Sequence, residues 1–126
     1  MARKQTPTLT EAELRLMKVL WDVKEATVTE VMEQLPKDLH LAYNSVLTTL
    51  RILETKGYLS HKKSGRAHIY YPLVTKKQTR NHVVKHMMSS FFNDSPELLL
   101  LSLFDNDDLT KEDINKLKEM IKKEGE

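Results

Sequence analysis

Residues 41–72, LAYNSVLTTLRILETKGYLSHKKSGRAHIYYP, decide the fold of this chain. The first half, Leu41–Lys56, has the apolar spacing of an amphipathic helix, and Gly57 suits the left-handed conformation in which helices end. The second half, Tyr58–Pro72, reads as two short strands joined by a turn at residues 64–66. A helix followed at once by a basic hairpin predicts a winged helix-turn-helix, with the helix in the major groove of DNA.

The predicted recognition helix has an apolar face and a polar face. At about 100° per residue, Val46, Leu50 and Leu53 fall within one narrow arc, so we expect them in the core. The opposite side carries short polar groups and one arginine: Asn44, Thr48, Arg51 and Thr55, flanked by Ser45 and Ile52, with Leu47 on the other edge. Such side chains let a helix approach DNA and hydrogen-bond to bases and phosphates. The alternative is an ordinary solvated face, although such faces usually carry more Lys and Glu.

The predicted hairpin carries positive charge near its tip. Arg66 lies in the turn, and Lys62 and Lys63 end the first strand. A basic tip on a two-stranded ribbon can reach a phosphate or the minor groove. An isolated hairpin of this kind could be a soluble edge, but directly after the predicted recognition helix it indicates a wing.

Charge is distributed unevenly, although the formal net charge is only +2. No acidic residue occurs between Glu54 and Asp94, a stretch that contains eight Lys and Arg residues and four His residues. Folded compactly, such a block forms a positive surface for which phosphate is the obvious partner. A solvated basic face remains the alternative.

The bulk composition limits the class of protein. A chain of 126 residues, 40% hydrophobic, makes one domain or a small domain with an accessory element. Without cysteine it has neither disulfides nor thiolate metal sites. Residues 1–7 form a polar, basic arm that does not resemble a signal peptide, and the longest apolar run, Leu98–Leu101, is too short to span a bilayer. We expect a soluble cytoplasmic protein with no membrane partner.

Capping signals predict where the other helices begin. Thr10 with Glu13 and Thr27 with Glu30 form two capping boxes, and Thr75 with Gln78 opens another helix after the wing. Leu14, Met17, Leu20 and Trp21 give the first helix its apolar spacing, and Pro36 stops the second. Ser95–Glu97 and Thr110 are further start signals that begin the last two helices.

The C-terminal part carries more apolar surface than a small helical unit can bury. We therefore predict a winged-helix DNA-binding domain at residues 1–75 and a helical dimerisation region at residues 76–126. The residues expected at the dimer contact are Val84, Met87, Met88, Phe91, Leu99, Leu100, Leu103, Leu117 and Ile121. The alternative is a monomer whose C-terminal helices pack back on the winged domain. A homodimer would place two recognition helices on a two-fold axis, which suits a palindrome.

Other functions have weaker signals. His82 and His86 are spaced i, i+4 on a helix, which could hold zinc or nickel, but two ligands are half a site. We therefore predict no metal and no cofactor, with a metal-responsive regulator as the alternative. No glycine-flanked serine, phosphate loop or paired carboxylates indicate an enzyme. A winged helix that binds protein rather than DNA is disfavoured by the acid-free stretch.

The motifs together resemble the penicillinase-repressor (BlaI/MecI/CopY) family. The similarity lies in Leu9–Leu14 with the apolar residues after it, in Leu41–Leu50 continuing to Leu59, and in Gly65–Pro72. It implies a homodimeric repressor of palindromic operators, with Asn44, Ser45, Thr48, Arg51 and Arg66 as DNA-binding residues. The family often has Thr at the position of Ser45 and a basic or polar residue at that of Leu47, so base preference is expected to differ.

The resemblance also bears on induction. In the β-lactam-responsive branch a membrane sensor triggers proteolysis at an Asn-Phe bond in the dimerisation region, which implies a regulatory protease of unknown identity as a partner. Here the aligned position reads Ser102-Leu103, so this route is in question. The paired cysteines of the copper branch are absent.

Overall fold

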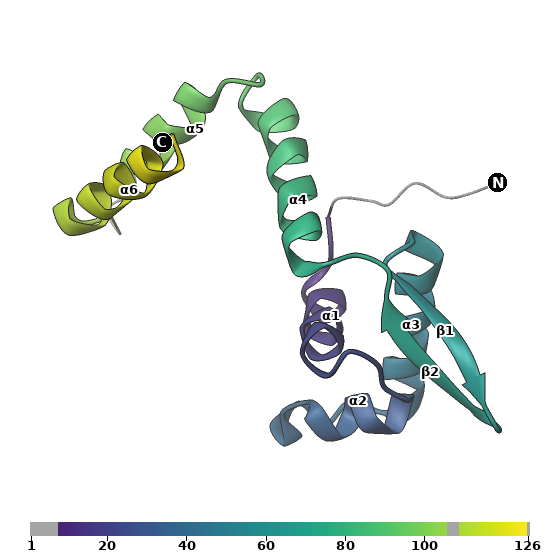
Figure 1. Cartoon of the computed structure of the whole chain (residues 1–126). Helices are drawn as coiled ribbons and strands as arrows, with labels where there is room; N and C mark the ends of the chain where they lie inside the picture. Colours follow the sequence, from purple (N-terminus) through teal and green to yellow (C-terminus); the bar gives the residue numbers. More distant parts are fainter. Residues whose placement is uncertain (1–7, 106–108, 126) are drawn as a thin grey trace. The chain divides into compact units, whose positions relative to one another are not determined.

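The computed structural model of the chain describes residues 8–105 and 109–125, so the arm predicted for residues 1–7 lies outside the described part (Figure 1). Contacts divide the chain into two compact units, one ending at Val84 and the other beginning at Lys85. The division falls inside a helix, whereas the functional boundary expected at residue 75 precedes that helix. That functional assignment stays a prediction.

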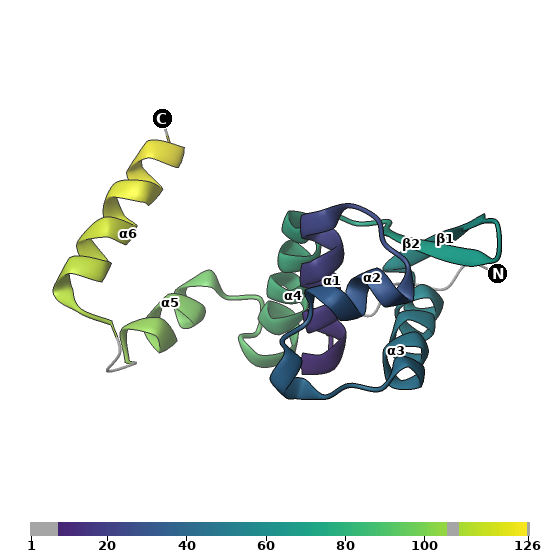
Figure 2. The ribbon, with the colours of Figure 1, turned by 90° about the horizontal axis from the view of Figure 1, so that it is seen from below.

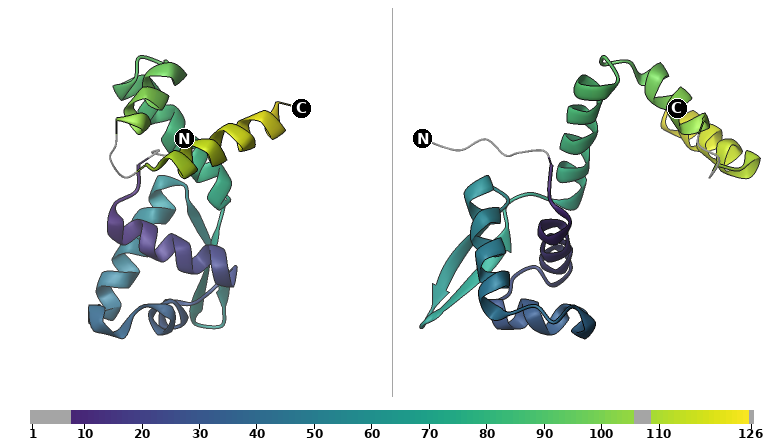
Figure 3. Two further views of the ribbon diagram at one scale, coloured as in Figure 1. Left: turned by 90° about the vertical axis from the view of Figure 1, so that its left-hand side faces the viewer. Right: turned by 180° about the vertical axis from the view of Figure 1, so that it is seen from behind.

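The first unit is a winged helix-turn-helix, as the sequence predicted. Its helices are α1 (Glu11–Val23), α2 (Val28–Gln34) and α3 (Tyr43–Lys56), with a short 3-10 helix η1 (Lys37–Leu39) between the last two. Strands β1 (Leu59–Ser64) and β2 (Ala67–Pro72) form the wing, and α4 (Lys76–Phe91) follows. The two views in Figure 3 show α1 crossing beside α3.

Local capping explains where these helices begin. The Thr10 hydroxyl accepts from the Glu13 amide at 3.1 Å and the Glu13 carboxylate accepts from the Thr10 amide at 2.7 Å. The same reciprocal pairs join Thr27 to Glu30 and Thr75 to Gln78. All three predicted helix starts are confirmed. Helix α3 lacks a side-chain cap and begins at Tyr43, slightly later than predicted.

The core of the first unit lies where the helices meet the base of the wing. Val46, Leu50 and Leu53 are at most 2% exposed, which confirms the apolar arc predicted for α3. They pack with Met17 and Leu20 of α1 and with residues of α2 and the wing. The polar face of α3 is thereby turned outward.

The wing is an antiparallel hairpin in which Leu59 pairs with Pro72 and Ser64 with Ala67. Gly65 has a φ of 63°, which a tight turn requires and glycine tolerates. Figure 2 shows the tip projecting away from the helices. At its base, Tyr70 exchanges two backbone hydrogen bonds with Ala26, at 2.8 and 3.0 Å, so the loop before α2 fixes the wing in place.

The second unit contains the end of α4, α5 (Pro96–Phe104) and α6 (Lys111–Glu124). Asn93 and Asp94 take left-handed conformations between α4 and α5, and Ser95 caps α5 as predicted. Thr110 and Asp113 form a capping box for α6. No residue of α5 or α6 is buried in the single chain, and none of the described helices is long and apolar enough to cross a membrane.

Candidate nucleic-acid interface

The polar face of α3 is open to solvent along its length. Asn44, Ser45, Thr48, Arg51 and Thr55 are all exposed. The buried side chains of the same helix lie on the opposite face, so the core fixes the rotation of α3 about its axis. Every α3 residue predicted for DNA binding is therefore accessible to a ligand. Which bases or phosphates they contact stays a prediction.

A hollow of about 310 Å³ joins this face to the wing. Arg51 of α3 and Arg66 of the turn both line it, although they are far apart in the sequence. Tyr43 and Thr29 line it too, although neither was predicted as a site residue from the sequence. Tyr43 is 50% exposed at the first turn of α3. Two arginines with a tyrosine and a threonine make a surface suited to phosphate.

Arg51 is held by the base of the wing. Its guanidinium interacts with the Tyr70 hydroxyl and lowers the pKa of that phenol, and Tyr70 is only 1% exposed. Burial, followed by the charge of Glu54, raises the pKa of Tyr70 by more than Arg51 lowers it, so the phenol stays neutral beside the guanidinium. The contact restricts a long side chain before any ligand binds, which lowers the entropic cost of using it.

Two histidines extend the contact between α3 and the wing. His61 Nδ1 lies 2.7 Å from a Glu54 carboxylate oxygen, and its ring stacks on His68 with centroids 4.5 Å apart. His68 lines the same hollow as Arg51 and Arg66. From the sequence these histidines are only part of the acid-free stretch, because their stacking depends on the strand register.

The two wing lysines differ in their surroundings. Lys62 is opposite Ile69 and Lys63 is opposite His68, so their side chains leave opposite faces of the hairpin. Lys62 is 2.7 Å from a Glu25 carboxylate oxygen, and that carboxylate raises the pKa of Lys62. Lys63 and Arg66 have no carboxylate within 4 Å among the described residues. The structure thus leaves Lys63 and Arg66 more available to phosphate than Lys62.

An ion pair fixes the end of α3 against α1. Lys56 Nζ lies 2.8 Å from a Glu13 carboxylate oxygen, and the Glu13 side chain is 5% exposed. Burial alone would raise the pKa of Glu13, but hydrogen bonds from Lys56 and Thr10 outweigh it and hold the pKa below its ordinary value. Glu13 therefore stays charged, caps α1 and positions α3 at once.

The remaining predicted residues lie on α4 to α6. Of the set expected at a dimer contact, Phe91 and Ile121 are exposed by 76% and 60%, and the others range from half-buried to exposed. His82 and His86 are both exposed on α4. Within the described ranges, no three His, Asp or Glu side chains gather in a way that could hold a metal ion. Ser102-Leu103 lies inside α5.

Comparison with known proteins identifies the family. Residues 9–123 match the profile of the penicillinase repressor family. The chain belongs to the penicillinase repressor family. The family match covers both units. The solved DNA-binding domain of the repressor BlaI matches 58% of this chain and has the winged-helix fold. Members of this family are DNA-binding transcriptional repressors, so the resemblance inferred from the motifs is confirmed.

The similar proteins include the penicillinase repressor of Bacillus licheniformis, 30% identical over 118 residues that span 94% of this chain and 92% of the relative. The methicillin resistance regulatory protein MecI of Staphylococcus aureus strain N315 is 22% identical over 119 residues, 94% of this chain and 97% of the relative. The solution structure of the DNA-binding domain of the repressor BlaI is 34% identical with a TM-score of 0.52, and the match covers 58% of this chain and 89% of that domain.

Proposed function

We propose that this repressor acts as a homodimer on a palindromic operator, with α3 in the major groove and the wing on the backbone or in the minor groove. The observation that carries the proposal is the hollow shared by Arg51 and Arg66, which joins the polar face of α3 to the wing. A duplex contacts both elements at once only if their cations face the same way. The solved BlaI domain, described as DNA-binding, has the same fold and supports the assignment.

Within this proposal the α3 residues have distinct roles. Asn44, Ser45 and Thr48 are short donors and acceptors near the start of the helix, where a recognition helix contacts base edges. Arg51 follows one turn later and reaches either a guanine edge or a phosphate. Thr55 lies at the C-terminal end of the same face and contacts the DNA backbone. Arg66 and Lys63 hold phosphates, because neither has an acidic partner among the described residues.

The homodimer is supported by apolar surface in the second unit. Leu101, Leu103 and Phe104 of α5 are 58%, 40% and 46% exposed in the single chain, and Met120 and Ile121 of α6 are exposed by 62% and 60%. Soluble monomers rarely expose so many large apolar side chains on two successive helices, because each exposed Å² of apolar surface costs about 25 cal/mol. A second copy covers them and also gives the two recognition helices their two-fold relation.

The proposal on DNA is tested with the full chain and an operator obtained by selecting bound fragments from genomic DNA. Arg51→Ala should weaken operator binding by about 1–3 kcal/mol, which is roughly 5- to 150-fold. Lys118→Ala removes an exposed cation of α6 and serves as the control, with operator affinity unchanged. Binding measured by fluorescence anisotropy at fixed salt decides the matter. If Arg51→Ala binds as the parent chain does, α3 does not read the operator in this way.

Release of the operator through cleavage by a regulatory protease would require α5 to unwind first. The bond at the family's cleavage position is Ser102-Leu103, and it lies inside helix α5. A protease binds its substrate in an extended conformation, so this turn of α5 would have to unwind before cleavage. To test this, purified repressor is incubated with lysate of host cells. The masses of the fragments show whether any cut falls at Ser102-Leu103.

A further inference from the structure

Beside Trp21 the first unit contains an apolar hollow of about 400 Å³ that shares no lining residue with the hollow of Arg51 and Arg66. Leu9, Leu14, Trp21 and Val83 form its apolar wall, and they come from the start of the described chain, from α1 and from α4. All of these residues belong to the first unit. A volume of this size is within the range of about 300–1,000 Å³ that is typical of small-molecule sites.

Two cations border the hollow. Lys76 and Arg80, one turn apart on α4, both line it. Neither has a carboxylate within 4 Å in the part of the chain that the structure describes, whereas Lys56 and Lys62 each have one. Thr79 between them is 5% exposed, but its hydroxyl already donates to the Thr75 carbonyl at 3.1 Å. The charged groups of the hollow are therefore positive and unpaired.

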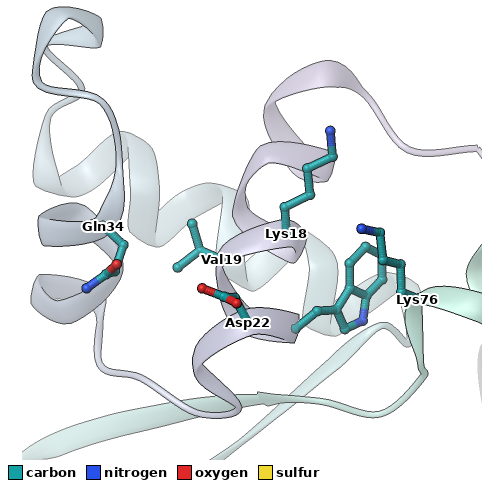
Figure 4. Close-up of a pocket in the computed structure, with 6 residues that line it drawn as sticks. Lys18, Val19, Asp22, Gln34 and Lys76 are labelled. Carbon is teal, nitrogen blue, oxygen red and sulfur yellow. The ribbon is translucent and has the colours of Figure 1, made fainter.

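The tryptophan that forms part of the wall is fixed in position. Its indole N–H donates to the Val74 carbonyl at 2.9 Å, which orients the ring between α1 and the segment that leads into α4. A neighbouring hollow of about 520 Å³ shares Trp21 and Lys76 (Figure 4). Its one acidic residue, Asp22, makes no ion pair with Lys18 or Lys76, and in Figure 4 its carboxylate points away from their ammonium groups.

We propose that the hollow beside Trp21 binds a small amphipathic carboxylate, with its apolar body against Leu9, Leu14, Trp21 and Val83 and its carboxylate on Lys76 and Arg80. An apolar wall with two unpaired cations at one edge matches a molecule that is apolar at one end and anionic at the other. A neutral apolar molecule would leave the cations unused, and an inorganic anion would leave the apolar wall wet. The site is separate from the DNA-facing hollow, which is lined by α2, α3 and the wing.

The test uses 3-phenylpropanoate as probe and 3-phenylpropanol as its neutral counterpart, with the full chain. Trp21 is the only tryptophan in the sequence, so its fluorescence reports on binding beside it. Because Trp21 lines both hollows and Arg80 lines only the one of about 400 Å³, the Arg80 variant shows which hollow is occupied. We expect a saturable fluorescence change with the carboxylate and at least about tenfold weaker binding of the alcohol, since a charge-assisted contact to each cation is lost. Lys76→Gln and Arg80→Gln should each weaken carboxylate binding by roughly threefold and leave the alcohol unaffected.

Lys77→Gln is the matched control, because Lys77 is an exposed cation on the same turn of α4 that does not line the hollow. It should bind the probe as the parent chain does. The proposal is overturned if the fluorescence does not saturate at millimolar probe, if acid and alcohol bind equally, or if Lys77→Gln has the effect of Arg80→Gln. Amide chemical-shift changes around Thr79 and Val83 with the carboxylate would support it independently, and changes confined to α5 and α6 would contradict it.

Discussion

Glu13→Gln removes one charge from a carboxylate that caps α1 and pairs with Lys56 at the end of α3. Glutamine keeps an oxygen that can accept from the Thr10 amide, so the loss is chiefly that of the ion pair. Breaking a fully buried pair costs about 3–5 kcal/mol and breaking an exposed pair about 0–1 kcal/mol. With side chains 5% and 26% exposed, Glu13 and Lys56 lie between these cases, and we expect destabilisation of about 2 kcal/mol.

Glu30→Gln is the matched control because Glu30 makes the same capping box with Thr27 but has no ion pair in the described structure. We expect it to change stability by less than about 0.5 kcal/mol. Urea unfolding of the full chain, followed by Trp21 fluorescence, reports on the first unit because Trp21 is the only tryptophan. In a thermal scan the Glu13→Gln loss corresponds to a lower Tm by roughly 8–16 °C.

The pH dependence provides a second check on the same pair. The folded-state pKa of Glu13 lies below its ordinary value of 4.5, so the unfolded chain takes up this proton first as pH falls. The contribution of the pair is therefore complete above pH 4.5 and is lost as pH falls through the folded-state pKa. Glu13→Gln should approach the parent chain in stability over that range. Two outcomes would refute the reasoning: an equal loss of unfolding free energy in the two Gln variants, or a stability difference between Glu13→Gln and the parent chain that persists in acid.

Three further predictions concern the wing, its base and the dimer. Arg66→Ala and Lys63→Ala should each reduce the slope of log K against log salt concentration by about one unit, because each variant loses one phosphate contact. Lys62→Ala should reduce this slope less. Anisotropy titrations at several salt concentrations compare the variants, and equal slopes for the two lysine variants would contradict the assignment. Tyr70→Phe should weaken operator binding by about 1 kcal/mol, because it frees the Arg51 side chain. In a chain that already carries Arg51→Ala this loss should vanish. A loss that persists in that chain would contradict a role of Tyr70 through Arg51. Leu103→Asp should turn a dimer into a monomer in sedimentation at micromolar concentration, and a parent chain that is itself monomeric would end the homodimer proposal.

Much of the first unit could be predicted from the sequence because its signals are local. Thr10 and Glu13 are one helical turn apart, so the cap depends on nothing distant. Val46, Leu50 and Leu53 share a face because the helix repeats every 3.6 residues. Gly57 and Gly65 occupy the left-handed positions at the end of α3 and in the wing turn. The exposed face of α3 follows from the same periodicity.

Tertiary structure decided which of these side chains share a surface. Nothing in the spacing of the sequence brings Arg51 beside Arg66, pairs Lys62 with Glu25, or sets Glu13 against Lys56, because each contact depends on how distant elements pack. The bridge from Ala26 to Tyr70 fixes the wing against the helices, and the hollow beside Trp21 exists only because the first turns of α4 lie near Leu9 and α1. Local chemistry thus determined the helices, the hairpin and their faces, while packing of distant segments decided which cations are paired and which remain free to bind.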